Sequence, residues 1–216
     1  MGLSHSPRIV TSGLRVCTDT VNAKSYSGSG TTITDMITKG SGSNIIPNSY
    51  VSWMNAGVSA ASFVVVIKRL TDNAGYALNP FFKYADTTNN TFNMYMFGNN
   101  AGASAANEGR IMWYANRDGT WNTISSSYVT AINETVIVQL QYNSSTGGQL
   151  WINGTATGSR TGSGILGSAT NTSNLTIYTP GTSSVATVYY TAIYDRELSS
   201  TEVLQNYAAL RGRYSI

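Results

Sequence analysis

The chain is poor in the residues on which metal and nucleophile chemistry most often depends. It has one cysteine, Cys17, and one histidine, His5, among 216 residues. A single cysteine excludes an intramolecular disulfide and a cysteine-based zinc site. We therefore expect Cys17 to be a small apolar core residue in a strand. A single histidine, with no G-x-S-x-G motif, excludes a histidine-based zinc site and a serine hydrolase triad.

Charge and long apolar runs are scarce as well. Only 11% of the residues are charged, the net charge is +3, and the one basic cluster is Arg211 with Arg213. A nucleic-acid-binding protein would carry a basic stripe, so we expect no nucleic-acid partner. The longest apolar run, residues 60–67, falls short of the roughly twenty residues of a membrane span and predicts a buried strand. Residues 1–7 contain no apolar segment, so we expect no cleaved export leader.

Short β-rich segments separated by Ser, Thr, Asn and Gly make up most of the chain. Residues 92–97 show the period-2 alternation of a strand with two different faces, either of which could face the core. Many short strands, one late helix and no long internal repeat predict an all-β fold, a two-sheet antiparallel jelly-roll sandwich. We expect a tail of residues 1–7 and a single domain over residues 8–216. The predicted strands are residues 8–16, 63–70, 81–85, 92–97, 110–114, 136–142, 149–152, 175–178 and 185–194.

Glycine and asparagine mark the predicted turns. Gly13 predicts a turn or bulge in the first strand. Gly147 and Gly148 are predicted to separate two strands, and Asn153 and Gly154 follow the second of them; both pairs contain residues that tolerate positive φ. The sequence therefore predicts a series of hairpins here.

The helix near the C-terminus has the clearest local signals. Ser199 can cap it while Glu202 bonds back to the Ser199 amide, and Leu198 can pack on Val203, which together give a capping box and a hydrophobic staple. Arg211 and Arg213 suit the negative end of the helix dipole, or alternatively a contact with a neighbouring subunit. The apolar face is predicted to consist of Val203, Leu204, Tyr207 and Leu210, with Glu202, Gln205 and Asn206 elsewhere.

Two motifs, one at each end of the chain, carry a family resemblance. Residues 13–36, GLRVCTDTVNAKSYSGSGTTITDM, and residues 193–216, IYDRELSSTEVLQNYAALRGRYSI, resemble the opening and closing motifs of LamG-like, concanavalin A-like domains. Such domains are common in tailed-phage virion proteins, and the resemblance implies the same sandwich fold. Residues 149–154, QLWING, resemble a hairpin of that family. Val21, Ser27 and Ile33 depart from the opening motif, which weakens the transfer of a ligand site.

The ten acidic residues do not form a recognisable catalytic arrangement. Glucanases on this fold place carboxylates alternately along one strand, and a retaining pair lies about 5 to 5.5 Å apart. No E-x-D-x-E sequence is present, and Asp195 with Glu197 is the only pair at strand spacing. That pair falls in the closing motif, where a role in the turn and the helix start is the simpler interpretation. We therefore expect a protein that is not an enzyme.

Two ligand sites remain as hypotheses. Asp19, Asn22 and Asp35 of the opening motif are oxygen donors of the kind that calcium prefers, although bonding to turn amides explains them equally simply. We expect no other cofactor. A shallow sugar site would combine aromatic and amide groups from loops and strand ends. The candidates for that site are Asn99, Asn100, Trp113, Asp118 and Trp121.

The leading functional hypothesis is a non-enzymatic phage virion structural protein at the virion surface. In this hypothesis the chain is a head-decoration or other capsid-surface component that also contacts host glycans. The alternative is a carbohydrate-binding receptor-recognition module of a tail or fibre. The expected partners are other virion proteins of the capsid or tail, further copies of this chain, and a glycan.

Overall fold

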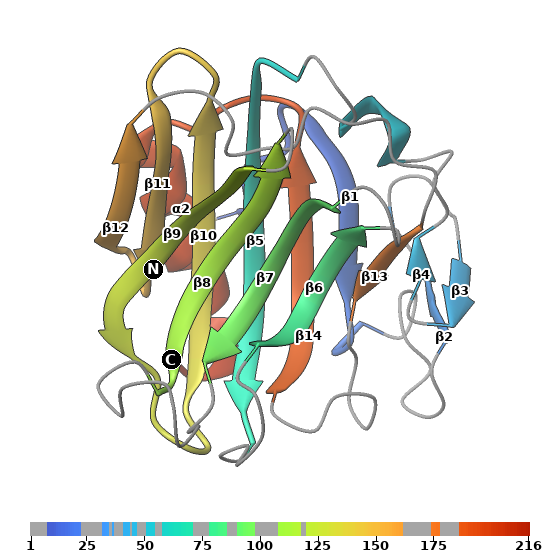
Figure 1. The fold of residues 1–216 in the computed structure, drawn as a ribbon. Helices are drawn as coiled ribbons and strands as arrows, with labels where there is room; N and C mark the ends of the chain where they lie inside the picture. The colour runs from blue at the N-terminus through green and yellow to red at the C-terminus, as the bar shows by residue number, and fades with distance from the viewer. Residues whose placement is uncertain are drawn as a thin grey trace.

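In its described residues, the protein is a sandwich of two antiparallel six-stranded sheets with one α-helix on an outer face, as its computed structural model shows (Figure 1). This confirms the predicted all-β jelly-roll fold. Both the tail of residues 1–7 and Asp35 lie outside the described residues. The structure describes residues 8–22, 32–34, 36, 41–43, 45–46, 51–54, 58–70, 78–85, 90–97, 108–117, 120–161, 174–177 and 186–216.

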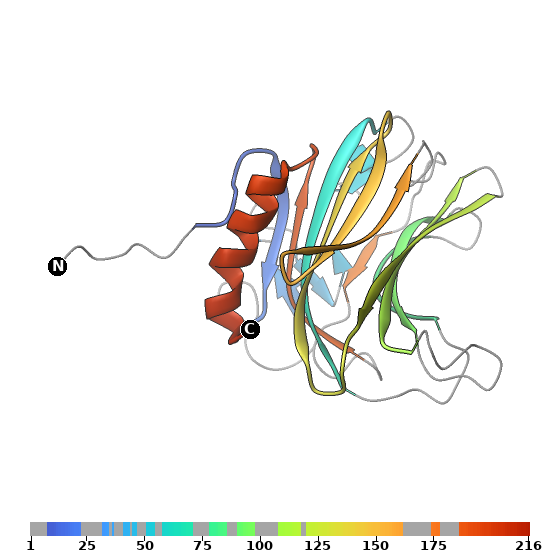
Figure 2. The ribbon, with the colours of Figure 1, turned by 90° about the vertical axis from the view of Figure 1, so that its left-hand side faces the viewer.

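The first sheet contains both the first and the last strand of the chain. The order of its strands is β1 (Leu14–Asp19), β14 (Ala186–Tyr194), β5 (Ala60–Arg69), β10 (Thr135–Asn143), β11 (Gly147–Ile152) and β12 (Thr155–Thr161). The helix α2 (Ser200–Tyr214) lies on the side of this sheet that faces away from the second sheet (Figure 2).

The second sheet consists mainly of a meander of four consecutive strands. Its order is β4 (Ile45–Ile46), β13 (Leu175–Ile177), β6 (Leu78–Ala85), β7 (Asn90–Phe97), β8 (Arg110–Arg117) and β9 (Thr120–Val129). A separate pair joins β2 (Thr32–Thr34) to β3 (Ser41–Ser43), and a short 3-10 helix, η1, spans Ser52–Met54.

The main core lies between the two sheets. Trp113 of β8 is fully buried and its ring packs on Phe63 of β5, with 4.9 Å between the ring centroids. Strand β5 is covered on both faces, because Val65 faces this core while Val64 and Val66 pack in the second cluster, under α2. Burial on both faces explains why residues 60–67 are all apolar except Ser62.

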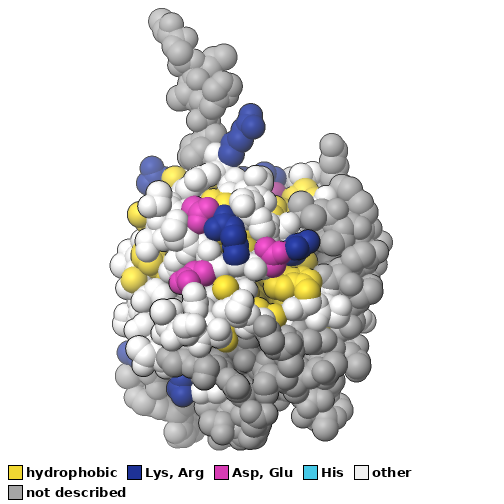
Figure 3. All heavy atoms as spheres, turned by 90° about the horizontal axis from the view of Figure 1, so that it is seen from above, with side chains coloured by type: hydrophobic (Ala, Val, Ile, Leu, Met, Phe, Trp, Pro, Cys, Tyr) yellow, Lys and Arg dark blue, Asp and Glu magenta, His cyan; other side chains and the backbone are white. Residues whose placement is uncertain are grey.

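The opening and closing motifs pack against each other. Strand β1 pairs antiparallel with β14, and the Asp195 amide donates to the Gly13 carbonyl at 2.9 Å. The Arg196 side chain donates to the Ser12 carbonyl at 3.0 Å. Figure 3 shows acidic and basic side chains gathered at this end of the sandwich, where Arg15 pairs with Asp195 at 2.5 Å. Two motifs 180 residues apart therefore form one structural unit.

The helix confirms the predicted cap and partly corrects the predicted face. Ser199 and Glu202 make both bonds of the capping box, and Leu198 and Val203 are buried in the same cluster. The helix buries Val203, Asn206 and Leu210, whereas Leu204 is 47% exposed. The prediction was wrong for Leu204 and for Asn206, because Asn206 can be buried once its amide is bonded on both sides.

Asn206 connects the helix to the first described residues of the chain. Its Oδ1 accepts from the Val10 amide at 2.8 Å, and its Nδ2 donates to the Tyr194 hydroxyl at 3.3 Å. The Tyr194 hydroxyl in turn donates to the Val10 carbonyl at 3.0 Å. Residues 8–10 thus form no strand with β14, and the predicted strand 8–16 begins only at Leu14. Gly13, at φ +76, forms the predicted turn before it.

The predicted turn at Asn153 and Gly154 is confirmed, whereas the predicted turn at Gly147 and Gly148 is shifted. Asn153 and Gly154 have φ of 49° and 76° and join β11 to β12. Gly147 also has positive φ, but Gly147 and Gly148 belong to β11 rather than separating two strands. Gly147 faces the β12 backbone so closely that a Cβ would lie 2.0 Å from the Arg160 carbonyl oxygen. Glycine is required there by a close backbone approach as well as by φ.

Candidate functional site

The outer face of the second sheet carries aromatic and polar side chains. On β7 the side chains of Met94 and Met96 are buried in the core between the sheets. Asn93 and Tyr95 therefore project from the opposite face, because successive strand residues alternate. The structure thus decides which side of residues 92–97 is core. We name this outer face the tyrosine face, and its residues are Lys83, Asn93, Tyr95, Met112, Tyr114, Thr123 and Ser125.

Tyr95 and Tyr114 form the aromatic centre of this face. They come from the neighbouring strands β7 and β8, and their rings meet edge to face with 5.7 Å between centroids. Both side chains are half-buried, so each presents part of its ring to solvent. Partial burial raises the pKa of Tyr114 above its usual value, so the phenol is protonated at neutral pH. The pair can offer an apolar ring surface beside hydroxyl groups.

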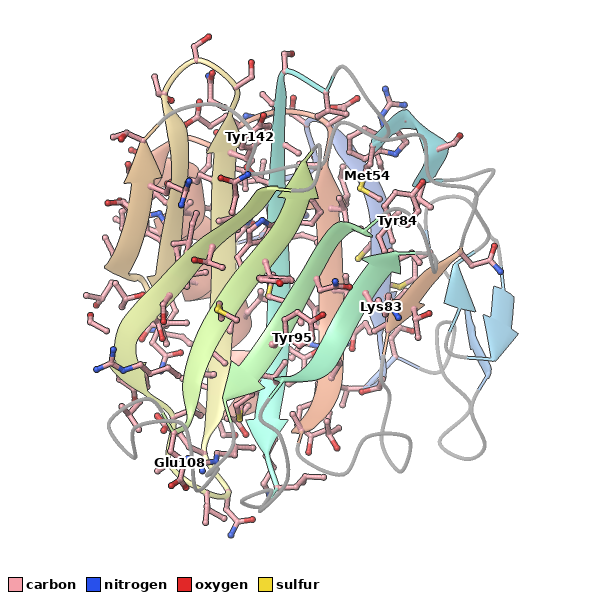
Figure 4. All side chains as sticks on the ribbon, viewed as in Figure 1. Met54, Lys83, Tyr84, Tyr95, Glu108 and Tyr142 are labelled. Carbon is pink, nitrogen blue, oxygen red and sulfur yellow. The ribbon has the colours of Figure 1, made fainter. Side chains whose placement is uncertain are left out.

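Asn93 lies in the cross-strand row between Lys83 on β6 and Tyr114 on β8. Figure 4 shows Lys83 and Tyr95 on neighbouring strands of this sheet. Asn93 is only 1% exposed, and its Oδ1 accepts no hydrogen bond from the described residues. A buried carbonyl oxygen without a donor costs about 1–3 kcal/mol, so its presence on this face calls for a ligand donor or a water.

Of the predicted sugar-site residues, only Trp113 has a described side chain. Trp113 faces the core with no exposed surface, so its ring cannot be a surface platform, and its place in the predicted site was wrong. The reason is strand alternation, which turns Trp113 inward and its neighbour Tyr114 outward. Trp121 lies on β9 opposite Asn116, with its side chain outside the described set. Asn99, Asn100 and Asp118 also lie outside the described residues.

Asp19, one of the calcium candidates, is already occupied by protein groups. Its carboxylate is 2% exposed and pairs with Arg213 at 2.6 Å. It accepts from the Tyr214 hydroxyl at 2.9 Å and from the Val21 amide at 3.0 Å. The Asn22 side chain lies 3.3 Å from the Met36 sulfur. Within the described residues, no cluster of three or more His, Cys, Asp or Glu residues is arranged to hold a metal ion.

The described carboxylates all hold structural contacts. The hydrogen bond that Tyr128 donates to Glu134, followed by burial, raises the pKa of Tyr128 to about 12. Asp195 and Glu197 follow the end of β14 and so do not alternate along a strand. The pairs are Asp19 with Arg213, Glu108 with Arg69, Glu134 with Tyr128, Asp195 with Arg15, Glu197 with Asn143 and Glu202 with Arg196.

Solved structures of low sequence identity share this fold. Trypanosoma rangeli sialidase in complex with the inhibitor DANA matches with a TM-score of 0.61 at 14% identity, over 95% of this chain and 35% of that one. The receptor-binding domain of botulinum neurotoxin D matches with a TM-score of 0.56 at 14% identity, over 71% of this chain and 38% of that one. The binding domain of botulinum neurotoxin DC in complex with SialylT matches with a TM-score of 0.54 at 11% identity, over 74% of this chain and 37% of that one.

These matches establish the β-sandwich fold and nothing finer. The chain spans little more than a third of the length of each of these solved chains, from 35% to 38%. No protein-family model and no curated protein matches the sequence. In the described part of the chain, no helix has the length and apolar character needed to cross a membrane.

Proposed function

We propose that this chain is a non-enzymatic glycan-binding domain and that the tyrosine face is its binding surface. The observation that carries the proposal is the Tyr95–Tyr114 pair beside the unpartnered Asn93 carbonyl. A sugar ring can lay its apolar C–H surface against a tyrosine ring while its hydroxyls bond to amides and phenols. A sugar hydroxyl that donates to Asn93 Oδ1 would remove the cost of that buried group.

Access to Asn93 requires a small movement of its neighbours. The half-buried side chains of Lys83 and Tyr114 flank it in the cross-strand row. Rotamer changes of this kind are common when an interface forms. The ammonium of Lys83 adds a donor at the edge of the face and favours glycans that carry an acidic group.

The solved neighbours support a binding role. One is a structure of botulinum neurotoxin type C, whose cell entry depends on interaction with two ganglioside molecules, and another is the binding domain of botulinum neurotoxin DC in complex with SialylT. The sialidase neighbour is an enzyme, so fold alone leaves the choice open. The structural pairing of the six described carboxylates favours binding over hydrolysis.

A glycan array tests the binding function directly. We expect the wild-type chain to bind a defined subset of sialylated, galactosylated or glucosylated oligosaccharides. Tyr114→Ala should weaken that binding by about tenfold, the loss of roughly 1.4 kcal/mol of aromatic contact. Tyr114→Phe should retain most of it, and Leu204→Ala on the exposed side of α2 serves as the matched surface control. A flat array, or equal binding by Tyr114→Ala, would contradict the proposal.

We further propose that the domain acts at the surface of a phage virion, as a capsid decoration or as a tail or fibre component. The sequence motifs of residues 13–36 and 193–216 support this location, because they resemble those of phage virion domains. Their described parts form one unit around β1, β14 and α2 on the side remote from the tyrosine face. Attachment through the motif side would leave the tyrosine face directed outward.

Cryo-electron microscopy of the native particle tests the location. Density for the sandwich on the icosahedral head at fixed stoichiometry would support a decoration role. Density at the tail or fibres would support receptor recognition. Absence of the chain from purified particles would contradict the virion proposal while leaving glycan binding to be judged by the array.

A further inference from the structure

A cavity lies on the opposite side of the molecule from the tyrosine face. It has a volume of about 660 Å³ and opens between the C-terminal half of α2, strands β1 and β14, and the segment 8–11. Figure 2 shows α2 and the described start of the chain side by side on the outer face of the first sheet. A volume of this size falls within the range of about 300–1,000 Å³ that small-molecule sites occupy.

The floor of this cavity is apolar. Cys17 of β1, Tyr190 of β14 and Leu210 of α2 line it, and each is at most 3% exposed. Ile9 and Met36 add partly buried apolar surface at its sides. The Cys17 thiol lies 3.6 Å from the Tyr190 hydroxyl, so the polar atoms of the floor partner each other. Such a floor favours the apolar part of a ligand.

The charges around the cavity are predominantly positive. Its lining includes Arg8, Arg213 and one acidic residue, Asp19. Asp19 is already paired with Arg213 at 2.6 Å, so its charge is compensated within the protein. Arg8 is exposed, and no ion pair or side-chain hydrogen bond joins its guanidinium to the described residues. A guanidinium at the margin of an apolar cavity is suited to a carboxylate, which it can bind through two hydrogen bonds.

We propose that this cavity is a binding site for a small amphipathic carboxylic acid. The apolar chain of the acid lies on Cys17, Tyr190 and Leu210, and its carboxylate pairs with Arg8. The proposal is independent of glycan binding at the tyrosine face, since none of the residues that line the cavity belongs to that face.

Titration calorimetry of the full chain with decanoate tests the proposal. We expect saturable binding to one site. Arg8→Ala should weaken it by about tenfold or more, as expected for the loss of a charge-assisted hydrogen bond. Decanol, which has the same chain without the charge, should bind at least about tenfold more weakly than decanoate. No saturable binding of decanoate, or equal binding of decanol, would overturn the proposal.

Two substitutions of Gly212 form a matched pair, one with a side chain large enough to fill the cavity and one with a side chain too small to do so. It lines the cavity, and an added Cβ would meet no atom within 4 Å. Gly212→Trp should abolish decanoate binding, whereas Gly212→Ala should bind like the wild type. Retention of wild-type affinity in Gly212→Trp would overturn the assignment of the site.

The single thiol supplies a second measurement that needs no variant. Cys17 lines the cavity and is the only cysteine of the chain. Saturating decanoate should slow the reaction of Cys17 with N-ethylmaleimide by about tenfold or more, because the occupied cavity excludes the reagent. An unchanged rate would place decanoate elsewhere. Tyr114→Ala should change neither measurement, so failure here and failure of glycan binding are distinguishable.

Discussion

The outer faces of the two sheets differ in what covers them. The first sheet lies beneath α2, which packs apolar residues such as Val203 on Val64, Val66 and Ile137. The second sheet exposes parts of Tyr95 and Tyr114, and no described helix packs on it. The same strand alternation thus gives a structural face on one sheet and a candidate recognition face on the other.

Side-chain amides on the covered face bond to the helix, although Gln139 Oε1, like Asn93 Oδ1, accepts no hydrogen bond from the described residues. Under α2, the Gln139 amide donates to the Val203 carbonyl at 3.0 Å, and Gln141 donates to the Leu198 carbonyl. These bonds fix the helix to the sheet. On the tyrosine face, no described residue donates a hydrogen bond to Asn93 Oδ1. We infer that substitutions on the covered face reduce stability, whereas substitutions on the tyrosine face reduce binding.

Removal of Asp19 should give the largest loss of stability. Asp19→Ala leaves the Tyr214 hydroxyl and the Val21 amide without their acceptor and removes the Arg213 pair, so we expect a loss of about 3 kcal/mol in the free energy of unfolding. Urea denaturation measures it. The control is Asp195→Ala, which breaks a more exposed pair with Arg15 and should cost about 0.5 kcal/mol. Equal losses of unfolding free energy in the two variants would contradict the inference that substitutions on the covered face cost the most stability.

Removal of the Asn206 side chain should have the next largest effect. Asn206→Ala leaves the buried Val10 amide without an acceptor, and we expect a loss of about 2 kcal/mol. Leu204→Ala on the same helix should change stability by less than about 0.5 kcal/mol, because Leu204 faces solvent. Thermal unfolding of both variants measures the difference. A larger loss in Leu204→Ala would refute the observed helix orientation.

The capping box predicts a dependence on pH. Hydrogen bonds from Arg196, followed by the Ser199 amide, lower the pKa of Glu202 from its usual 4.5 to about 2. Because the folded-state pKa is depressed, this stabilisation is complete above about pH 4.5 and is lost as the pH falls toward about 2. Glu202→Gln should cost about 1 kcal/mol at neutral pH. The free energies of unfolding of the wild type and the variant should converge as the pH falls. A difference between them that stays constant down to about pH 2 would show that the ionised Glu202 carboxylate is not the source of the stabilisation.

The smallest effect on stability is expected on the tyrosine face. Tyr114→Ala removes one edge-to-face contact from a half-buried position, so we expect a loss of at most about 1 kcal/mol. Its effect on glycan binding should exceed its effect on stability. Circular dichroism and thermal unfolding of the purified variant check that the fold is retained. A loss comparable to that of Asp19→Ala would make Tyr114 a structural residue.

The fold was predictable where local chemistry and tertiary packing agree. Ser199 and Glu202 specify the helix start through contacts only three residues apart. Strands β9 and β12 were missed, because their sequences, TWNTISSSYV and TATGSRT, are rich in Ser and Thr and carry little apolar alternation. Strand β9 pairs with β8 and β12 pairs with β11, and the two strands approach each other across the sandwich. A Cβ on Gly158 of β12 would lie 2.2 Å from the Ser125 carbonyl oxygen of β9.

The candidate site was much less predictable. The alternation of residues 92–97 showed two faces, but the identity of the core side depends on strands far away in the sequence. Trp113 is suited to a sugar platform by residue type, yet it packs on Phe63, fifty residues earlier in the chain. The better signal was its neighbour Tyr114, which the cross-strand register places beside Asn93.

Hydrogen–deuterium exchange of the chain, with and without a saturating array-selected oligosaccharide, tests the central claim most directly. If the tyrosine face is the recognition surface, protection should concentrate in β6, β7 and β8, and α2 and β1 should exchange as in the free protein. Protection confined to α2, β1 or the segment 8–11 would contradict the claim and would place recognition on the helix-covered side.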